Sequence, residues 1–296
     1  MDNLKQVILH LGAHKTASTH FGGVIHGNNE LRKSCGVAAP RKGILRAELV
    51  KRISDIKDDK PVPAGISRQA RGLAGKWSRL LVMDENILGT PSRLFQNGAM
   101  YPRAARRVGR AARMFEGLDV TLMLAIRNPA TFSAASWSEA LRSNPYRSFE
   151  AYLEGAQASD ISWLTVITAI RKAAPQAALV VWRYEDYRVL LPQLVACALH
   201  QPRDTVLEFK TLQSPVRVGL SARALTEICQ RNLDSNVAPD PAEVEAIMAN
   251  YPKSGAFPAP MPWSDADRKI LEARYGRDCE ALSQLEGITL LDAGSR

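Results

Sequence analysis

Residues 5–23, KQVILHLGAHKTASTHFGG, place an apolar run, a short turn and a polar helix start directly after one another. The run VILHL at 7–11 is rich in aliphatic residues and ends at Gly12, which is typical of a buried strand and too short for a helix. Gly12 permits a tight turn, and the hydroxyl residues of the segment TAST at 16–19 favour the start of a helix. The stretch therefore predicts a strand, a turn and a helix.

The turn has the features of a phosphate-binding site. The first N–H groups of a helix lack partners within the helix and lie at its positive end, and Lys15 adds a full charge at the same place. The loop is not the GxxxxGK[ST] motif of ATP-binding proteins, because no glycine precedes Lys15 and the loop is shorter. The alternative interpretation is an ordinary strand–turn–helix with a solvated lysine.

The composition is that of a globular chain able to bury a sizeable core. Of 296 residues, 46% are hydrophobic and 23% are charged. The net charge of +9, from 39 basic and 30 acidic residues, favours anionic partners without choosing among nucleotides, acidic glycans, nucleic acids and membrane surfaces.

The cysteines, the histidines and the N-terminal residues argue against a disulfide-rich, metal-binding, secreted or membrane protein. The four cysteines are scattered without a CxxC pair, as expected of reduced core residues, and the five histidines have no metal-ligand spacing. The chain enters its first strand without a signal peptide, and no apolar run is long enough to span a membrane. We therefore expect a cytoplasmic protein without a metal site, and we expect neither a membrane nor a nucleic acid as its partner.

Further apolar runs alternate with helical patterns along the chain. We expect strands at 79–85, 118–126 and 177–182, a loop at 38–43, and helices at 44–56, 101–114, 134–142, 149–156, 161–173, 190–199, 221–232, 241–250 and from 264 onward. Pro129 suits the start of the helix that contains 134–142. This alternation predicts an α/β fold, a parallel sheet flanked by helices with a helical C-terminal part.

The residues that follow the four predicted strands are charged or polar. They are 14–16 (HKT), 84–86 (DEN), 127–129 (RNP) and 183–186 (RYED). Because ligands of parallel sheets bind outside the carboxyl ends of the strands, we expect these four segments to meet in one crevice.

Two of these segments resemble the cofactor-binding motifs of sulfotransferases that use 3′-phosphoadenylyl sulfate (PAPS), most closely bacterial members akin to the carbohydrate type. Lys15-Thr16-Ala17-Ser18-Thr19 is similar to the family's 5′-phosphosulfate loop, with Ala17 in place of the usual glycine. Arg127-Asn128-Pro129 with Ser136 is similar to its 3′-phosphate segment, although the serine is usually eight residues after the arginine, where Ala135 stands here.

The resemblance implies a P-loop-like fold, one domain over 1–296, and sulfuryl transfer from PAPS to a hydroxyl or amine with adenosine 3′,5′-bisphosphate (PAP) as product. It places the cofactor at His14, Lys15, Thr16, Ala17, Ser18 and Thr19, and at Arg127 and Ser136.

Glu85 is the predicted catalytic base, and Lys15 is predicted to neutralise charge on the leaving phosphate. A partly desolvated carboxylate can have its pKa raised toward the operating pH. Asp84 is the reserve, and His14 is a further alternative. Residues 79–85, RLLVMDE, are also similar to the Mg²⁺-binding strand of P-loop kinases and ATPases, so an ATP–Mg²⁺ enzyme and a non-catalytic nucleotide-binding homologue remain open.

Two further patterns bear on the site. Residues 183–186 are similar to a Tyr-Glu-Asp segment of the family, which implies a structural role in which Glu185 pairs with an arginine near the cofactor. Five arginines share one face of the helix at 101–114, namely Arg103, Arg106, Arg107, Arg110 and Arg113. They form either a solvated face or a surface for an acidic acceptor, most readily a saccharide.

Overall fold

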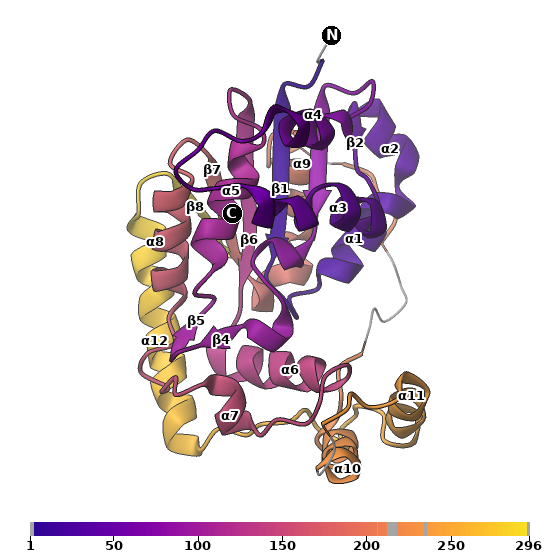
Figure 1. Ribbon diagram of the computed structural model, residues 1–296, viewed down its shortest axis with the longest axis vertical. Coiled ribbons are helices and arrows are strands. Elements are labelled where there is room, and N and C mark those ends of the chain that lie inside the picture. Colours follow the sequence, from indigo (N-terminus) through magenta and orange to yellow (C-terminus); the bar gives the residue numbers. More distant parts are fainter. Residues whose placement is uncertain (1–2, 206, 212–217, 234–235, 295–296) are drawn as a thin grey trace.

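A computed structural model describes residues 3–205, 207–211, 218–233 and 236–294. Its centre is a six-stranded sheet in the order β2-β3-β1-β6-β7-β8, in which all neighbouring strands pair in parallel (Figure 1). The strands are β2 (Val37–Ala38), β3 (Arg79–Met83), β1 (Gln6–Gly12), β6 (Asp119–Ile126), β7 (Ala178–Arg183) and β8 (Ile288–Leu291). The predicted α/β class with a parallel sheet is confirmed.

The central strand β1 sits between β3 and β6. Val7 pairs with Leu80 on one side and with Val120 on the other. The chain continues from β1 through β2 and β3 on one side, and then crosses to β6 on the other. The carboxyl end of β1 is therefore a point where the strand order reverses, which is where open α/β sheets bind ligands.

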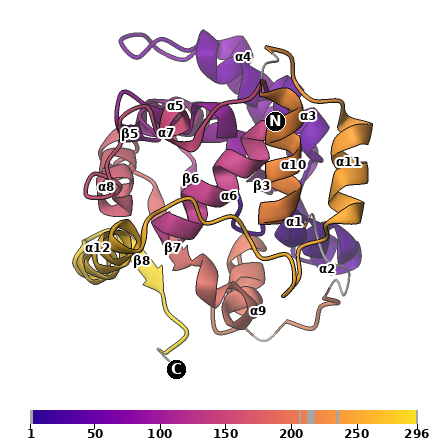
Figure 2. The same ribbon diagram turned by 90° about the horizontal axis from the view of Figure 1, so that it is seen from below.

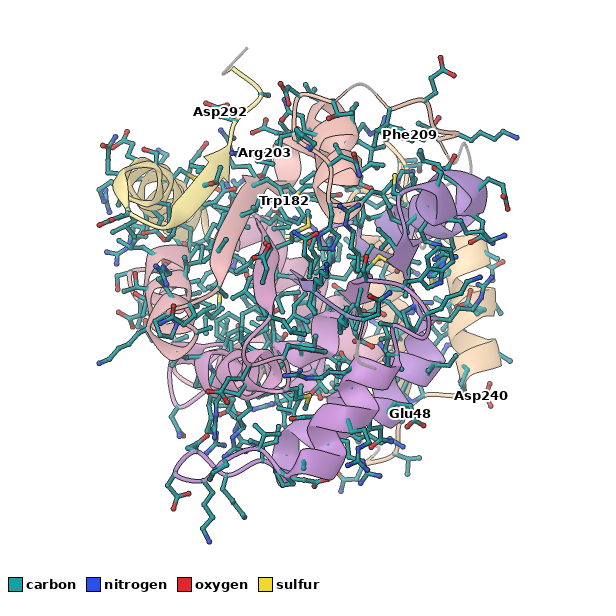
Figure 3. All side chains as sticks on the ribbon, turned by 90° about the horizontal axis from the view of Figure 1, so that it is seen from above. Glu48, Trp182, Arg203, Phe209, Asp240 and Asp292 are labelled. Carbon is teal, nitrogen blue, oxygen red and sulfur yellow. The ribbon has the colours of Figure 1, made fainter. Side chains whose placement is uncertain are left out.

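Alternate residues of the strands face two separate cores. Leu9 and Val82 belong to the larger core, against helices α3 (Lys42–Glu48), α4 (Ala64–Gly72), α5 (Ala104–Arg113), α8 (Trp163–Ala173) and α12 (Asp265–Gln284). Ile8 and Trp182 belong to the other core, against α1 (Ser18–Gly27), α2 (Asn29–Ser34) and α9 (Tyr187–Ala198). Figure 3 shows Asp240 and Asp292 near the outline of the molecule and Trp182, which is 1% exposed, nearer its middle. Helices thus cover both faces of the sheet.

A further group of elements lies beyond the carboxyl ends of the strands (Figure 1). It comprises α6 (Pro129–Leu141), α7 (Phe149–Leu153), the hairpin of β4 (Phe95–Gln96) and β5 (Ala99–Met100), α10 (Ala222–Asn232) and α11 (Pro241–Asn250). Seen from below, α6, α10 and α11 lie together at this end (Figure 2). Leu141 of α6 packs in one small core with Leu225 of α10 and Ile247 of α11.

Helix α8 is tied to α12 through a buried carboxylate. Asp278 is 1% exposed and accepts hydrogen bonds from Trp163 N at 2.7 Å, Ser162 Oγ at 3.1 Å and Leu164 N at 3.3 Å. Trp163 Nε1 in turn donates to Arg127 O at 2.7 Å. The last long helix therefore positions a residue at the end of β6.

Most predicted elements are present, but the helices α2 and α4 and several short strands were not predicted. The loop predicted at 38–43 contains the last residue of β2 and the start of α3, and the helix predicted at 44–56 is α3 followed by a separate 3₁₀ turn, Val50–Asp55. β2, β4, β5 and β8 were not predicted, because two to four residues are too short for a periodic pattern to stand out. The helical C-terminal part is present as predicted.

Candidate active site

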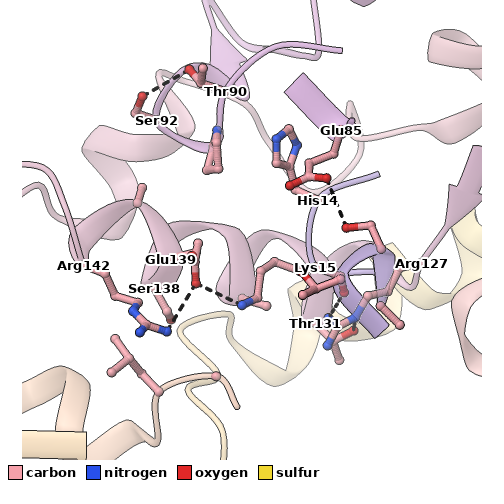
Figure 4. A pocket seen from close by; sticks show the side chains of 18 of the residues that line it. His14, Lys15, Glu85, Thr90, Ser92, Arg127, Thr131, Ser138, Glu139 and Arg142 are labelled. Atoms are coloured by element: carbon pink, nitrogen blue, oxygen red, sulfur yellow. Dashed lines mark hydrogen bonds and ion pairs between the residues drawn. The ribbon is translucent and has the colours of Figure 1, made fainter. Parts of the chain in front are cut away.

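A cavity of about 670 Å³ lies at the carboxyl ends of β1, β3, β6 and β7. Its lining includes His14, Lys15, Glu85, Arg127 and Tyr184, so segments after all four predicted strands do meet in one crevice. Figure 4 shows several of the lining side chains around the loop after β1. The remaining walls come from α6, the segment 90–92, and the C-terminal residues 219–220, 253 and 259–261.

The loop after β1 has an unusual backbone conformation and passes close to Glu85. Gly12 has φ +91°, and a Cβ atom there would stand 2.9 Å from Glu85 Cβ. Lys15 and Ala17 have φ of +57° and +65°, in the left-handed region that favours glycine. The glycine-like conformation of Ala17 agrees with its place in the motif, where the family has glycine.

The loop turns its predicted ligands in different directions. His14, Lys15, Ala17, Ser18 and Thr19 line the cavity. The side chain of Thr16 instead faces inward, because the residue is 2% exposed and its Oγ1 donates to Ala13 O at 2.7 Å. Thr16 therefore braces the loop.

Lys15 points along the cavity toward α6. Its Nζ lies 3.0 Å from Glu139 Oε2, and both side chains are mostly buried. Glu139 also lies 3.7 Å from Arg142 Nη1, one turn further along α6. The loop lysine is thus held by a carboxylate on the opposite wall of the cavity (Figure 4).

Arg127 lies at the end of β6 and is oriented by four contacts. Its Nη1 donates to Lys15 O at 2.8 Å, its Nε donates to Thr131 Oγ1 at 3.0 Å, and its guanidinium lies 4.7 Å from the ring centre of Tyr184. Its own carbonyl is held by Trp163. Arg127 therefore joins the end of β6 to the loop after β1.

The serine predicted on α6 does not reach the cavity. Ser136 is fully buried, it is absent from the cavity lining, and its Oγ has no hydrogen-bond partner among the described residues. Thr131, Ala135 and Ser138 line the cavity instead. Successive helix residues are rotated by about 100°, so Ser136 is turned away from the face that contains Ala135.

Glu85 stands at the cavity wall in a strongly basic environment. Lys42 Nζ lies 2.6 and 2.9 Å from its two oxygens, and Ser18 Oγ donates to Oε2 at 3.2 Å. Burial alone would raise the pKa of Glu85, but the charge and hydrogen bonds of Lys42 outweigh it and lower the pKa to about 2. The expectation of a raised pKa for Glu85 is therefore wrong.

Asp84, the reserve for the base, is structural in its contacts. It is fully buried, it accepts from Asn86 N at 2.8 Å at the start of the 3₁₀ turn Glu85–Ile87, and it pairs with Arg46 Nε at 2.8 Å. It is not part of the cavity lining.

His14 lies beside Glu85 and against Tyr101. Its Nδ1 is 2.6 Å from Tyr101 Oη, and burial lowers the pKa of the imidazole. With the Asn86 amide oriented so that its oxygen accepts from Arg46, its nitrogen donates to His14 Nε2 at 3.2 Å. Both ring nitrogens are thus engaged by the protein.

Glu185 is structural, as predicted, but with other partners. Its two oxygens accept from Asn128 N and from Tyr275 Oη, each at 2.8 Å. The expected pairing with an arginine is replaced by a bond to the backbone next to Arg127. Glu185 thereby connects β7, α6 and α12.

The arginine face of α5 stays outside the cavity. Arg110 pairs with Asp58 at 2.6 Å, Arg107 donates to Ile87 O and Asn86 O, and Arg113 donates to the carbonyl of Lys57. Three of these five arginines thus hold the loop 57–60 and the turn after β3. None of the five lines the cavity.

Five charged residues at the cavity were missed by sequence reasoning. Arg46, Glu139, Arg142 and Lys253 line the cavity, and Lys42 reaches Glu85 from the start of α3. Four of them lie in or at the ends of helices, whose patterns mark the apolar face without identifying which polar residues face a ligand, and Lys253 lies in an irregular segment. Within the described part of the chain, no group of three His, Cys, Asp or Glu residues could hold a metal ion, and no helix is both long and apolar enough to cross a membrane.

No protein-family model matches the chain, and no curated protein matches it. Among solved structures, a match is the crystal structure of a sulfotransferase from Alicyclobacillus acidocaldarius, which is 15% identical and covers 82% of this chain and 95% of its own, with a TM-score of 0.35.

Proposed function

We propose that the protein is a sulfotransferase that moves a sulfuryl group from PAPS to a hydroxyl or amine, with a saccharide as the expected acceptor. The observation that carries the proposal is the presence of two cationic anchors in one cavity, Lys15 and Arg127, joined by the hydrogen bond from Arg127 Nη1 to Lys15 O. PAPS has anionic groups on both its 5′ and its 3′ side, and two such anchors fit that charge pattern.

The loop and helix α1 would hold the 5′ side. Lys15, the hydroxyl groups of Ser18 and Thr19, and the N–H groups at the start of α1 all belong to the cavity wall or its floor. An anion bound at the loop would compete with Glu139 for Lys15, since Glu139 Oε2 lies 3.0 Å from Lys15 Nζ.

Arg127 and Thr131 would hold the 3′ phosphate, in place of the buried Ser136. Tyr184 and His20 line the same cavity and offer rings on which a purine can stack. His20 is itself fixed by Tyr187 Oη, 2.7 Å from its Nδ1.

Glu85 is the proposed base and takes the proton of the acceptor hydroxyl. When bound, PAPS supplies the sulfuryl group: a bond forms between the acceptor oxygen and sulfur, the bond from sulfur to the bridging phosphosulfate oxygen breaks, and PAP leaves. Negative charge at the loop repels the Glu85 carboxylate and draws Lys42 toward itself, so it raises the pKa of Glu85 and makes it a better base. Lys15 neutralises charge on the leaving side.

A kinase or ATPase using ATP and Mg²⁺ is the rival enzyme. Carboxylates that bind Mg²⁺ must offer oxygens to the ion, whereas Asp84 is paired with Arg46 and Glu85 with Lys42. These pairings favour sulfuryl transfer. A non-catalytic homologue would bind PAP without turnover.

A thermal-shift comparison of PAP, ADP and ATP with Mg²⁺ tests the proposal. PAP should raise the melting temperature more than ADP, because ADP lacks the 3′ phosphate that Arg127 would bind. In Arg127→Ala the preference for PAP should disappear, a loss of about 1.5–3 kcal/mol for a charged hydrogen bond.

Arg106→Ala is the control, since Arg106 is exposed and outside the cavity. It should keep the preference for PAP. If ADP still raises the melting temperature of Arg127→Ala, the loop after β1 is intact in that variant. Equal shifts with PAP and ADP in the unchanged protein, or a shift that needs ATP with Mg²⁺, would refute the proposal.

A further inference from the structure

The end of the cavity distant from Arg127 is built by different elements. In Figure 4, Thr90 and Ser92 lie on the same side of the view as Arg142, and the cavity lining also includes Ser143, Asn144, Lys253 and residues 259–261. Arg127 and Arg142 flank the two ends of α6, whose 13 residues span about 20 Å. In Figure 4, Lys15 lies between them. This end is therefore distant from Arg127, and it adjoins Lys15 through Glu139, which lies between Lys15 and Arg142.

Arg142 is a buried cation with an unsatisfied donor at this end. Its side chain is 11% exposed, and its Nη2 donates to Glu245 Oε1 at 2.7 Å. Its Nη1 is buried and has no hydrogen-bond partner among the described residues, since Glu139 is 3.7 Å away. A buried N–H without an acceptor is unfavourable, so the Arg142 guanidinium would be stabilised by an anion that came within hydrogen-bond distance of Nη1.

Lys253 adds a second cation from the C-terminal segment. It is exposed, it lines the cavity, and it has no ion-pair partner within the part of the chain that the structure describes. Glu245, the partner of Arg142, is 66% exposed on the outer side, so solvent screens its charge. Glu139 is shared between Lys15 and Arg142. Positive charge is thus in excess here.

The surroundings of the two cations suit a hydroxylated ring. Thr90, Ser92 and Asn144 offer hydroxyl and amide groups, while Pro260 and Met261 offer apolar surface. A sugar ring has hydroxyl groups on its edge and C–H groups on its faces, and both kinds of surface find partners.

We propose that this end of the cavity is an anion subsite, in which Arg142 and Lys253 bind a carboxylate or sulfate ester of a sugar-acid acceptor. The inference rests on the proposed sulfotransferase function, because only a transferase has an acceptor. Binding of an anionic sugar at the subsite can nevertheless be measured without any transfer reaction. It assigns acceptor selectivity to the cavity and leaves the arginine face of α5 with a structural role.

The test compares three probes that differ in one group: 4-nitrophenyl β-D-glucuronide, the 6-sulfate of 4-nitrophenyl β-D-glucoside, and the neutral glucoside. Dissociation constants are measured by saturation-transfer NMR with and without PAP. At least one anionic probe should bind about tenfold or more tightly than the neutral one, as expected for a charged hydrogen bond. Which anion wins distinguishes a carboxylate from a sulfate ester.

Arg142→Gln and Lys253→Gln should each reduce that preference severalfold, and Arg106→Gln, the same change on the exposed face of α5, should leave it unchanged. Because Lys253 is exposed, we expect Lys253→Gln to fold, so the proposal can still be tested if Arg142→Gln does not. Equal binding of all three probes, no binding of either anionic probe, or a preference that survives both cavity variants would overturn the subsite.

The two proposals fail separately. A protein that binds PAP in preference to ADP but shows no anionic preference loses the subsite alone. A protein that prefers the anionic probes but does not distinguish PAP from ADP keeps the subsite and loses the sulfotransferase proposal.

Discussion

Glu85 is an ionised carboxylate held by Lys42 at the wall of the cavity. The two residues are 43 positions apart in sequence, and the pair forms because α3 begins beside the end of β3. Desolvation, taken alone, favours the protonated form, and the adjacent ammonium reverses its effect on the pKa. The charge state of this residue is set by its neighbour.

Glu85→Gln keeps the shape of the side chain but cannot accept a proton. Turnover with PAPS should fall by about 10²–10⁴, while binding of PAP, measured by thermal shift, should survive. Single-turnover assays with a sulfate-labelled donor give the rate.

Asp84→Asn and Glu272→Gln complete this experiment. Glu272 is exposed on α12, so its variant should have unchanged turnover. Asp84→Asn should lower stability more than turnover, because Asp84 is buried against Arg46. If Asp84→Asn abolishes turnover and Glu85→Gln does not, the base has been misassigned. Normal turnover in both would move the role to His14.

At the scale of elements, α6 shows how one helix can serve two environments. Its cavity-facing residues Thr131, Ala135, Ser138 and Arg142 recur every three or four positions, while Ser133 and Ser136 are fully buried. A displacement of one residue is enough to move a serine from one face to the other. A sequence motif on a helix therefore identifies a ligand-binding residue only once it is known which face of the helix that residue lies on.

The contact between α12 and α8 includes one buried carboxylate besides its apolar packing. Asp278→Ala removes the acceptor of two backbone N–H groups and of Ser162 Oγ. We expect a loss of about 3 kcal/mol in the free energy of unfolding, measured by urea titration. Because Trp163 also holds Arg127 O, PAP binding should weaken as well.

Asp265→Ala is the matched control on the same helix. Asp265 is 87% exposed and pairs with Arg268, so its loss should change stability by about 0.5 kcal/mol or less. Similar effects of the two substitutions would mean that Asp278 is not a structural anchor.

For the whole molecule, buried histidines predict sensitivity to acid. Burial lowers the pKa of His10, between Phe21 and Trp182, to about 4, and that of His200 to about 4. Between pH 6.5 and 4 the unfolded chain then binds more protons than the folded one, so stability falls as the pH falls. A difference of one pKa unit between the folded and unfolded states corresponds to about 1.4 kcal/mol. His10 alone therefore changes the free energy of unfolding by on the order of 3 kcal/mol over this pH range.

Urea titrations from pH 7.5 to 4.5 measure this slope. His10→Leu should make it shallower, whatever its effect on stability at pH 7.5. A stability independent of pH between 6.5 and 4.5 would contradict neutral burial of His10.

The cavity combines the sheet with the C-terminal part of the chain. Its lining runs from His14 to Met261, so neither part forms it alone. We therefore propose that residues 1–296 act as one domain.

Local patterns of sequence were enough for β1, β3, β6 and β7, for most of the longer helices and for the meeting of four segments at one edge of the sheet. Periodicity and turn residues act between neighbours in the chain, and parallel strands place their carboxyl ends together. Lys15, Glu85 and Arg127 could be located in this way, because each follows a predicted strand.

Tertiary packing alone decided which partners those residues have. Lys15 meets Glu139 across 124 positions, and Glu85 meets Lys42 from a segment expected to be a loop. The orientation of α6 buries Ser136 and exposes Arg142 to the cavity. Charges, hydrogen bonds and burial depend on distances between segments, and no pattern within one segment contains those distances.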